Sequence, residues 1–179
     1  MSSPAAKEAL MNLSESLFLA VVVLLPGFSA AQIEVKEPNA IVELGGAASW
    51  NVKGSGSSYG PNFAVECTPI EHWLELEAGV TPLFSSHTTE WDTDLLFKKP
   101  WTLSHKLEFM FGVGPEWVHT NEKGAQRNSL AGEAALDFMF WPSAKRRFGW
   151  YLEPGYDTNF GRGHEHSIGV SGGLLIAIP

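Results

Sequence analysis

The sequence has little of what several protein classes require. Its single cysteine, Cys67, excludes a disulfide framework. The 12 lysines and arginines are outnumbered by 20 acidic residues, so a basic surface for nucleic acid is not expected. The longest apolar run, Leu17–Leu25, is too short to cross a bilayer as a helix. What the 179 residues do contain is 7 Trp, 11 Phe and 18 Gly, a composition that favours β-structure over long helices.

The first segment has the order of a secretory signal peptide. The apolar run Leu17–Leu25 is followed by Pro-Gly and then by small residues up to Ala31. This order predicts a signal peptide over residues 1–31 and one domain over residues 32–179. Lys7 is the only cation ahead of the run, so a retained membrane anchor is the alternative.

From Val42 onward the apolar residues recur with a period of two, which is the mark of strands with unlike faces. One face of the segment 107–114 carries Leu, Phe, Phe and Val, and the other carries Glu, Met, Gly and Gly. The pattern predicts eight strands, at 41–52, 61–69, 73–82, 89–98, 105–118, 129–141, 148–158 and 166–178. Short turns are expected at 69–72, 99–104 and 142–147, and generally longer polar loops at 53–60, 83–88, 119–128 and 159–165. In an up-and-down order these two sets fall at opposite ends, with both chain termini at the short-turn end.

Side-chain size indicates which face is inside. The acidic face also carries many glycines and alanines, whereas the other face carries Leu, Phe, Val, Ile and Trp. An eight-stranded barrel has room only for side chains, so the face of small residues fits inside. The bulky face then points outward and requires lipid, because such a surface would aggregate in water. The aromatic residues expected to form girdles at the lipid boundary are Trp50, Trp91, Trp117 and Trp150.

In this pattern and spacing the sequence resembles the small OmpA/OmpX-type outer-membrane barrels. The resemblance implies an all-β fold, an eight-stranded antiparallel up-and-down transmembrane β-barrel, in a bacterial outer membrane. It also implies a monomer in contact with outer-membrane lipid, with a structural or surface-interaction role, no catalysis and no cofactor. A partner outside the cell would meet the longer loops. Two features depart from the family: the chain ends Ile178-Pro179 instead of in an aromatic residue, and Pro115 and Pro154 fall within strands, as bulges or where a strand leaves the bilayer.

With the small face inward, many carboxyl groups point into the barrel. They belong to Glu66, Glu75, Glu77, Asp92, Asp94, Glu108, Glu116, Glu133, Asp137, Glu153 and Asp157, with Lys106 as the clearest inward cation. Two interpretations stay open. The cluster is either a polar plug satisfied by Tyr, Ser, Thr and loop Arg side chains, or an interior that binds cations or buffers protons. An open pore is not expected, because eight-stranded interiors are normally filled.

Other polar residues suggest alternatives to a structural barrel. His166 and Ser167 invite comparison with lipid-modifying barrel enzymes, but adjacent residues of a strand face opposite ways, so no catalytic role follows. His164 and His166, with Asp157 nearby, have the spacing of a metal pair, although we predict no metal site. A third class is a soluble, secreted, lipocalin-like binding barrel.

Two smaller features complete the expectations from sequence. Cys67 shares the outward face of its strand and is expected to meet lipid. Lys145, Arg146 and Arg147 are expected to form a cationic patch on a short turn, either solvated or in contact with lipid headgroups.

Overall fold

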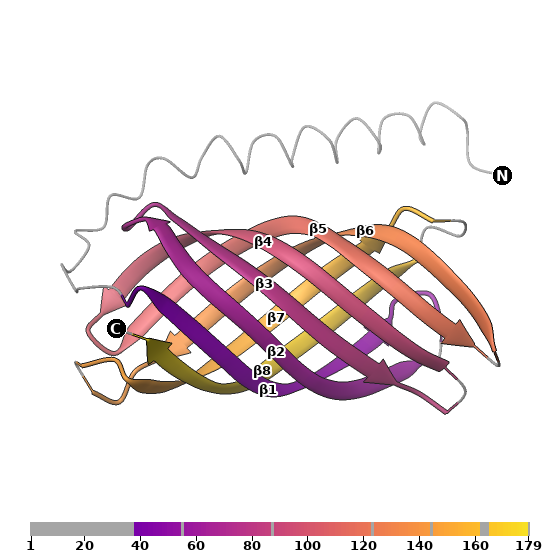
Figure 1. Ribbon diagram of the computed structural model, residues 1–179, viewed down its shortest axis with the longest axis horizontal. Helices are drawn as coiled ribbons and strands as arrows, with labels where there is room; N and C mark the ends of the chain where they lie inside the picture. Colours follow the sequence, from indigo (N-terminus) through magenta and orange to yellow (C-terminus); the bar gives the residue numbers. More distant parts are fainter. Residues whose placement is uncertain are drawn as a thin grey trace, which may run out of the picture. The chain divides into compact units, whose positions relative to one another are not determined.

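The computed structural model describes residues 38–178, except residues 55, 87, 123, 144 and 162–164. These residues form a closed barrel in which each strand pairs antiparallel with its neighbours in the sequence, and the last strand pairs with the first (Figure 1). Within that part of the chain no helix is long and apolar enough to cross a membrane. The predicted signal peptide, residues 1–31, lies outside the described residues.

The eight strands follow the predicted order. They are β1 (Ala40–Asn51), β2 (Ser57–Ile70), β3 (Leu74–Phe84), β4 (Thr88–Ser104), β5 (Leu107–Glu122), β6 (Ala125–Phe140), β7 (Phe148–Asn159) and β8 (His166–Ile178). The fold class predicted from the sequence, an eight-stranded antiparallel up-and-down transmembrane barrel, is therefore confirmed. Four strands, β2, β4, β5 and β6, are longer than predicted by two residues or more.

The extra strand length comes from segments whose apolar alternation stops while the backbone pairing continues. The expected loop at 119–128 is a tight β5–β6 hairpin, since Glu122 pairs with Ala125 and Gly124 takes a positive φ of 88°. The expected turn at 99–104 is also wrong, because β4 runs on to Ser104 and turns only at residues 105–106. Backbone pairing between strands needs no apolar face, so a polar segment can pair as a strand while its sequence has the composition of a loop.

The connections divide the barrel into two ends. We call the end with the β2–β3, β4–β5 and β6–β7 connections the turn end, and the opposite end the loop end. Pairing of Ala40 with both Cys67 and Ile178 places the start of β1 and the end of β8 at the turn end, as predicted. The expected contrast in length between the two ends is wrong. The β6–β7 connection at the turn end, residues 141–147, is longer than every connection at the loop end, and the β3–β4 and β5–β6 connections are no longer than the β2–β3 turn.

The two prolines considered from the sequence as bulges, Pro115 and Pro154, do not form bulges. Pro115 pairs with Gly132 and Pro154 pairs with Val170, and the register is continuous on both sides of each pair. On the other flank of each proline the register is also unshifted, although the Cα pairing is interrupted there. Each proline therefore leaves one neighbouring strand without a donor while the barrel keeps its register.

Most of the bulky apolar side chains point outward, and many glycines and alanines point inward. Phe63, Val65, Phe97 and Val113 are among many large apolar residues that remain exposed. On the inside, a Cβ added at Gly114 would meet the backbone carbonyl of Leu95. Backbone approaches this close admit only glycine, which explains the small residues on the acidic face.

Candidate functional site

The turn end of the barrel interior is filled by apolar side chains. The buried residues in contact there are Ile41, Met110, Met139, Trp141, Tyr151 and Leu175. They come from strands β1, β5, β6, β7 and β8 and from the β6–β7 connection. We call this group the apolar plug. The apolar plug fills the turn end of the interior with side chains, as expected for a barrel of this strand number.

Arg146 closes the turn end together with the apolar plug. Its Nη1 donates to Oε2 of Glu108 at 2.6 Å, and its guanidinium lies 5.8 Å from the ring centroid of Trp141. The prediction that Arg146 belongs to an exposed cationic patch is therefore wrong. The reason is the positive φ of 43° at this residue, which turns its side chain into the barrel. Lys145 and Arg147 on either side are exposed.

Lys98 is the centre of an ionic cluster deeper in the barrel. Its Nζ donates to Glu153 at 2.6 Å, to Asp137 at 3.1 Å and to Glu77, and it lies 3.9 Å from Oε2 of Glu66. The lysine side chain is fully buried. Because ionised groups are costly to bury alone, the shared ammonium is what holds these acids together.

The prediction of Lys106 as the inward cation is wrong. Lys106 lies in the β4–β5 turn and is exposed, because β4 is longer than expected and the turn comes later. Lys98 shares the even-numbered face of β4 with Asp92 and Asp94, so the alternation already contained the signal. It was missed because the strand was expected to end at that residue.

A chain of hydrogen bonds links the apolar plug to the space above it. The Tyr151 hydroxyl donates to Oδ1 of Asn62 at 2.5 Å, and Nδ2 of Asn62 donates to Oγ1 of Thr81 at 2.9 Å. All three side chains are buried. They fix the orientation of the Asn62 amide and cross-link strands β7, β2 and β3 across the interior.

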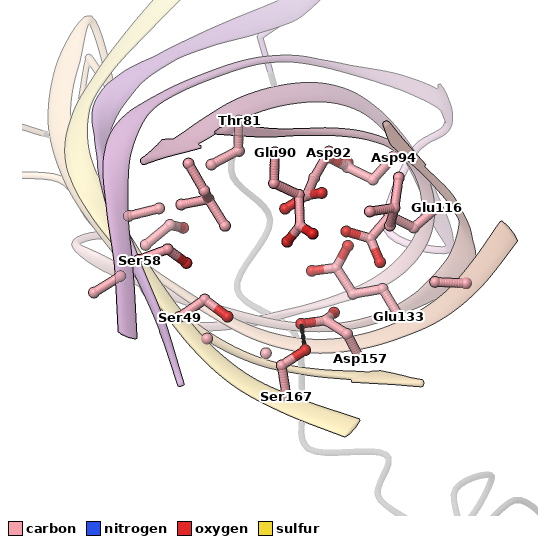
Figure 2. A pocket seen from close by; sticks show the side chains of 18 of the residues that line it. Ser49, Ser58, Thr81, Glu90, Asp92, Asp94, Glu116, Glu133, Asp157 and Ser167 are labelled. Atoms are coloured by element: carbon pink, nitrogen blue, oxygen red, sulfur yellow. Dashed lines mark hydrogen bonds between the residues drawn. The ribbon is translucent and has the colours of Figure 1, made fainter. Parts of the chain in front are cut away.

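The loop end of the interior is an acidic cavity of about 290 Å³. Figure 2 shows carboxyl groups from several strands pointing into it; they belong to Glu90, Asp92, Asp94, Glu116, Glu133 and Asp157. Ser167 donates to Oδ2 of Asp157 at 3.4 Å, and Thr120 donates to Oε2 of Glu90 at 3.1 Å. Residues at the loop ends of the strands, such as Ser57 and Glu165, line its mouth.

The eleven acidic residues singled out from the sequence divide between these levels. Glu66, Glu77, Asp137 and Glu153 surround Lys98; Asp92, Asp94, Glu116, Glu133 and Asp157 line the acidic cavity; Glu108 pairs with Arg146; and Glu75 is buried in β3. Sequence reasoning missed Glu43 and Glu90. Both lie on the acidic face of their strands, so strict alternation would have included them.

The four tryptophans predicted to form girdles are all exposed. They are Trp50, Trp91, Trp117 and Trp150. The first three lie towards the loop end, and Trp150 lies near the turn end, where exposed Trp73 follows β2. Trp141 differs, because its ring is buried in the apolar plug.

His166 and Ser167 lie on opposite faces of β8. Ser167 lines the acidic cavity. The ring of His166 stacks on that of Tyr156, and a hydrogen bond of 3.0 Å joins Nδ1 of His166 and the Tyr156 hydroxyl. The two side chains therefore form no histidine–serine pair. The other half of the suggested metal pair, His164, lies outside the described residues. Cys67 is exposed on the outward face of β2.

The sequence matches no protein-family model, and a search of curated proteins finds no match to it. Similar solved structures exist. The Neisserial surface protein A has a TM-score of 0.59 at 9% identity, covering 78% of this chain and 96% of its own. The N-terminal β-barrel domain of Pseudomonas aeruginosa OprF has a TM-score of 0.54 at 12% identity, covering 79% of this chain and 100% of its own.

A third similar structure is Ail, the attachment invasion locus protein of Yersinia pestis. Its TM-score is 0.50 at 10% identity, with 79% of this chain and 100% of Ail covered. Identities this low carry information about fold and not about ligands. The strand number, the closed topology, the outward apolar face and these likenesses agree: the chain has the fold of the small OmpA/OmpX-type outer-membrane β-barrels.

Proposed function

We propose that the protein is a non-enzymatic barrel of the bacterial outer membrane with a structural or surface-interaction role. The observation that carries this proposal is the outward face, where large apolar residues such as Leu95, Phe97 and Val113 are exposed between aromatic residues near the two ends. A surface of this kind requires hydrocarbon around it and headgroups at its borders. A soluble lipocalin-like barrel would hold these side chains inside.

The filled interior supports a barrel that does not conduct. The apolar plug and the Arg146–Glu108 pair occupy the turn end, and the Lys98 cluster occupies the next level. Any solute entering from the loop end would have to displace both groups. The interior therefore supports a blind cavity and not a passage.

The loop end is the surface on which a partner would meet the protein. The connections there are short and polar, and between them opens the acidic cavity. Its carboxyl groups favour cationic over anionic partners, so a nucleic acid does not fit this surface. Closure of the barrel leaves no strand edge to pair with a second copy, which supports a monomer.

The enzyme alternative is a lipid-modifying barrel that uses His166 and Ser167. Their positions on opposite sides of the barrel wall do not support it. This alternative predicts that the protein modifies the acyl chains of lipid A and that His166→Ala and Ser167→Ala would each abolish this modification. We expect the lipid profile of cells expressing either variant to match that of cells expressing the unaltered chain.

The experiment that tests the proposal is expression of the full chain in a Gram-negative host, followed by membrane fractionation. We expect the protein in the outer-membrane fraction, resistant to carbonate and released by detergent, with a gel mobility that changes on boiling. In planar bilayers the purified protein should give no stable conductance. Recovery without detergent would overturn the membrane assignment, and a regular open channel would overturn the closed interior.

A further inference from the structure

Four buried carboxyl groups converge at the level of Lys98. Glu43, Glu66, Glu77 and Asp137 each offer an oxygen atom, and these four atoms all lie within 4.8 Å of one another. Glu43, Glu66 and Glu77 come from the adjacent strands β1, β2 and β3, while Asp137 comes from β6. We call these residues the carboxylate cluster. It connects two parts of the barrel wall that are not neighbours in the sheet.

Negative groups outnumber positive groups at this level. Lys98 is the one cation that the described residues bring to the cluster, and its ammonium already contacts Glu77, Asp137 and, outside the cluster, Glu153. Five carboxyl groups, counting Glu43 and Glu66, therefore share one ammonium group. Such an excess of acids in a dry interior calls for further positive charge or for protons.

Several oxygens of the carboxylate cluster have no hydrogen-bond partner among the described residues. They are both Oε atoms of Glu66, Oε1 of Glu43 and Oδ1 of Asp137. The exposed fraction of Glu66, Glu43 and Asp137 is only 1%, so bulk water does not reach them. Buried acceptors are normally paired, and acceptors left over in a convergent group indicate a ligand that donates positive charge.

We propose that the carboxylate cluster binds one hard divalent cation of the size of Ca²⁺. The available ligand atoms are all oxygens, which are the ligands that Ca²⁺ and Mg²⁺ prefer. Softer metals prefer nitrogen or sulfur ligands. Mg²⁺ is usually held by one or two carboxylates and keeps several of its waters, whereas Ca²⁺ accepts six to eight oxygen ligands in a flexible geometry. Four protein carboxyl groups that converge on one point therefore suit the larger ion. Water would complete its coordination.

The ion has a route to this site from the loop end. Glu77 belongs to the carboxylate cluster and also lines the acidic cavity, so the floor of the cavity reaches the site. At the turn end the apolar plug closes the alternative route. The site itself does not depend on the barrel's role; only entry from outside the cell rests on the proposed outer-membrane orientation. Once bound, the ion ties β1–β3 to β6 and stabilises the barrel.

The test uses the full chain folded in detergent, stripped with a chelator and equilibrated with radioactive Ca²⁺. We expect one Ca²⁺ per barrel at about 1 mM free ion or below, the range of extracellular calcium modules, and weaker binding of Mg²⁺. Glu66→Gln keeps the side-chain volume and removes one ligand charge, so the affinity should fall at least about tenfold, a change of about 1.4 kcal/mol. The matched control is Glu133→Gln, which removes a carboxyl group of the acidic cavity and should change the affinity by less than about threefold.

A second variant tests the role of the lysine. Lys98→Met removes the competing ammonium, so Ca²⁺ should bind more tightly than to the unaltered chain and should raise the unfolding temperature by more. If Glu66→Gln does not fold, Glu43→Gln takes its place, since that residue offers an unpartnered oxygen in the same group. The proposal is overturned if the unaltered chain binds no Ca²⁺ at millimolar concentrations. It is equally overturned if Glu133→Gln loses as much affinity as Glu66→Gln, or if Lys98→Met gains none.

Discussion

Replacement of Val113 by arginine tests whether this side chain points outward and whether it lies near the middle of the lipid bilayer. Val113 has an exposed fraction of 43% and pairs with Phe97 and Ala134 in the middle of the sheet. On β4, Trp91 and Trp101 bracket Phe97 ten residues apart. At about 3.3 Å per residue and a tilt of about 40°, that separation spans about 25 Å, the height of the apolar band of an outer-membrane barrel.

An arginine at the centre of this band should be expensive. We expect Val113→Arg to lower the free energy of unfolding by about 2–4 kcal/mol in phospholipid vesicles, since that is the cost of arginine at the bilayer midplane. The matched variant is Phe148→Arg, at the first residue of β7, where the side chain has an exposed fraction of 66% and the headgroups are near. Its cost should be about 0–1 kcal/mol.

Denaturant titration of both variants in vesicles, followed by tryptophan fluorescence, measures the two costs. Val113→Arg with the same stability as the unaltered chain would refute the reasoning, because it would place that side chain in water. Equal costs for the two variants would refute it as well, since they would show that depth in the membrane does not matter.

Two further predictions concern the interior. Arg146→Ala should lower the free energy of unfolding by about 3 kcal/mol, because it leaves the Glu108 carboxylate buried without its cation. Arg147→Ala, at the exposed neighbouring residue, should change the free energy of unfolding by less than about 0.5 kcal/mol. Equal effects of the two variants in denaturant titrations would argue against the Arg146–Glu108 pair as the group that closes the turn end. Gly114→Ala should cost about 1–3 kcal/mol or prevent folding, because its Cβ would meet the Leu95 carbonyl, whereas Gly56→Ala has open space around its Cβ. A heat-dependent gel shift retained equally by both glycine variants, with equal stability, would contradict the close approach of the strands.

The arrangement of strands and the direction of their faces followed from the sequence because both depend on a local pattern. Alternation such as that of Leu107–Val113 shows which residues share a face of a strand. The occurrence of glycine and glutamate on the same face indicates that this face is inside the barrel. The strand ends did not follow. The backbone pairing of the segments that hold Thr120 and Arg127 needs no apolar side chains, so these segments have the composition of a loop while they pair as strands.

The residue types of the candidate site could be predicted from the sequence, but their positions relative to one another could not. Inward-facing acids could be identified on each strand, but the height at which Glu43, Glu66 and Asp137 meet depends on the stagger between strands, which no single strand records. Lys98 and Arg146 show the two limits. Lys98 was expected at the end of a strand, but that strand continues to Ser104. The side chain of Arg146 enters the barrel because this residue has a positive φ, which no sequence pattern predicts for arginine.

Spin-label accessibility along β5 tests the central claim most directly. Single cysteines would replace Phe109, Phe111 and Val113 on one face and Glu108 and Met110 on the other, in a Cys67→Ser background folded into vesicles. The account predicts that labels at 109, 111 and 113 collide with dissolved oxygen and are shielded from a water-soluble nickel chelate, while labels at 108 and 110 are reached little by oxygen. The opposite phase, with oxygen reaching 108 and 110 and the nickel chelate reaching 109, 111 and 113, would contradict it.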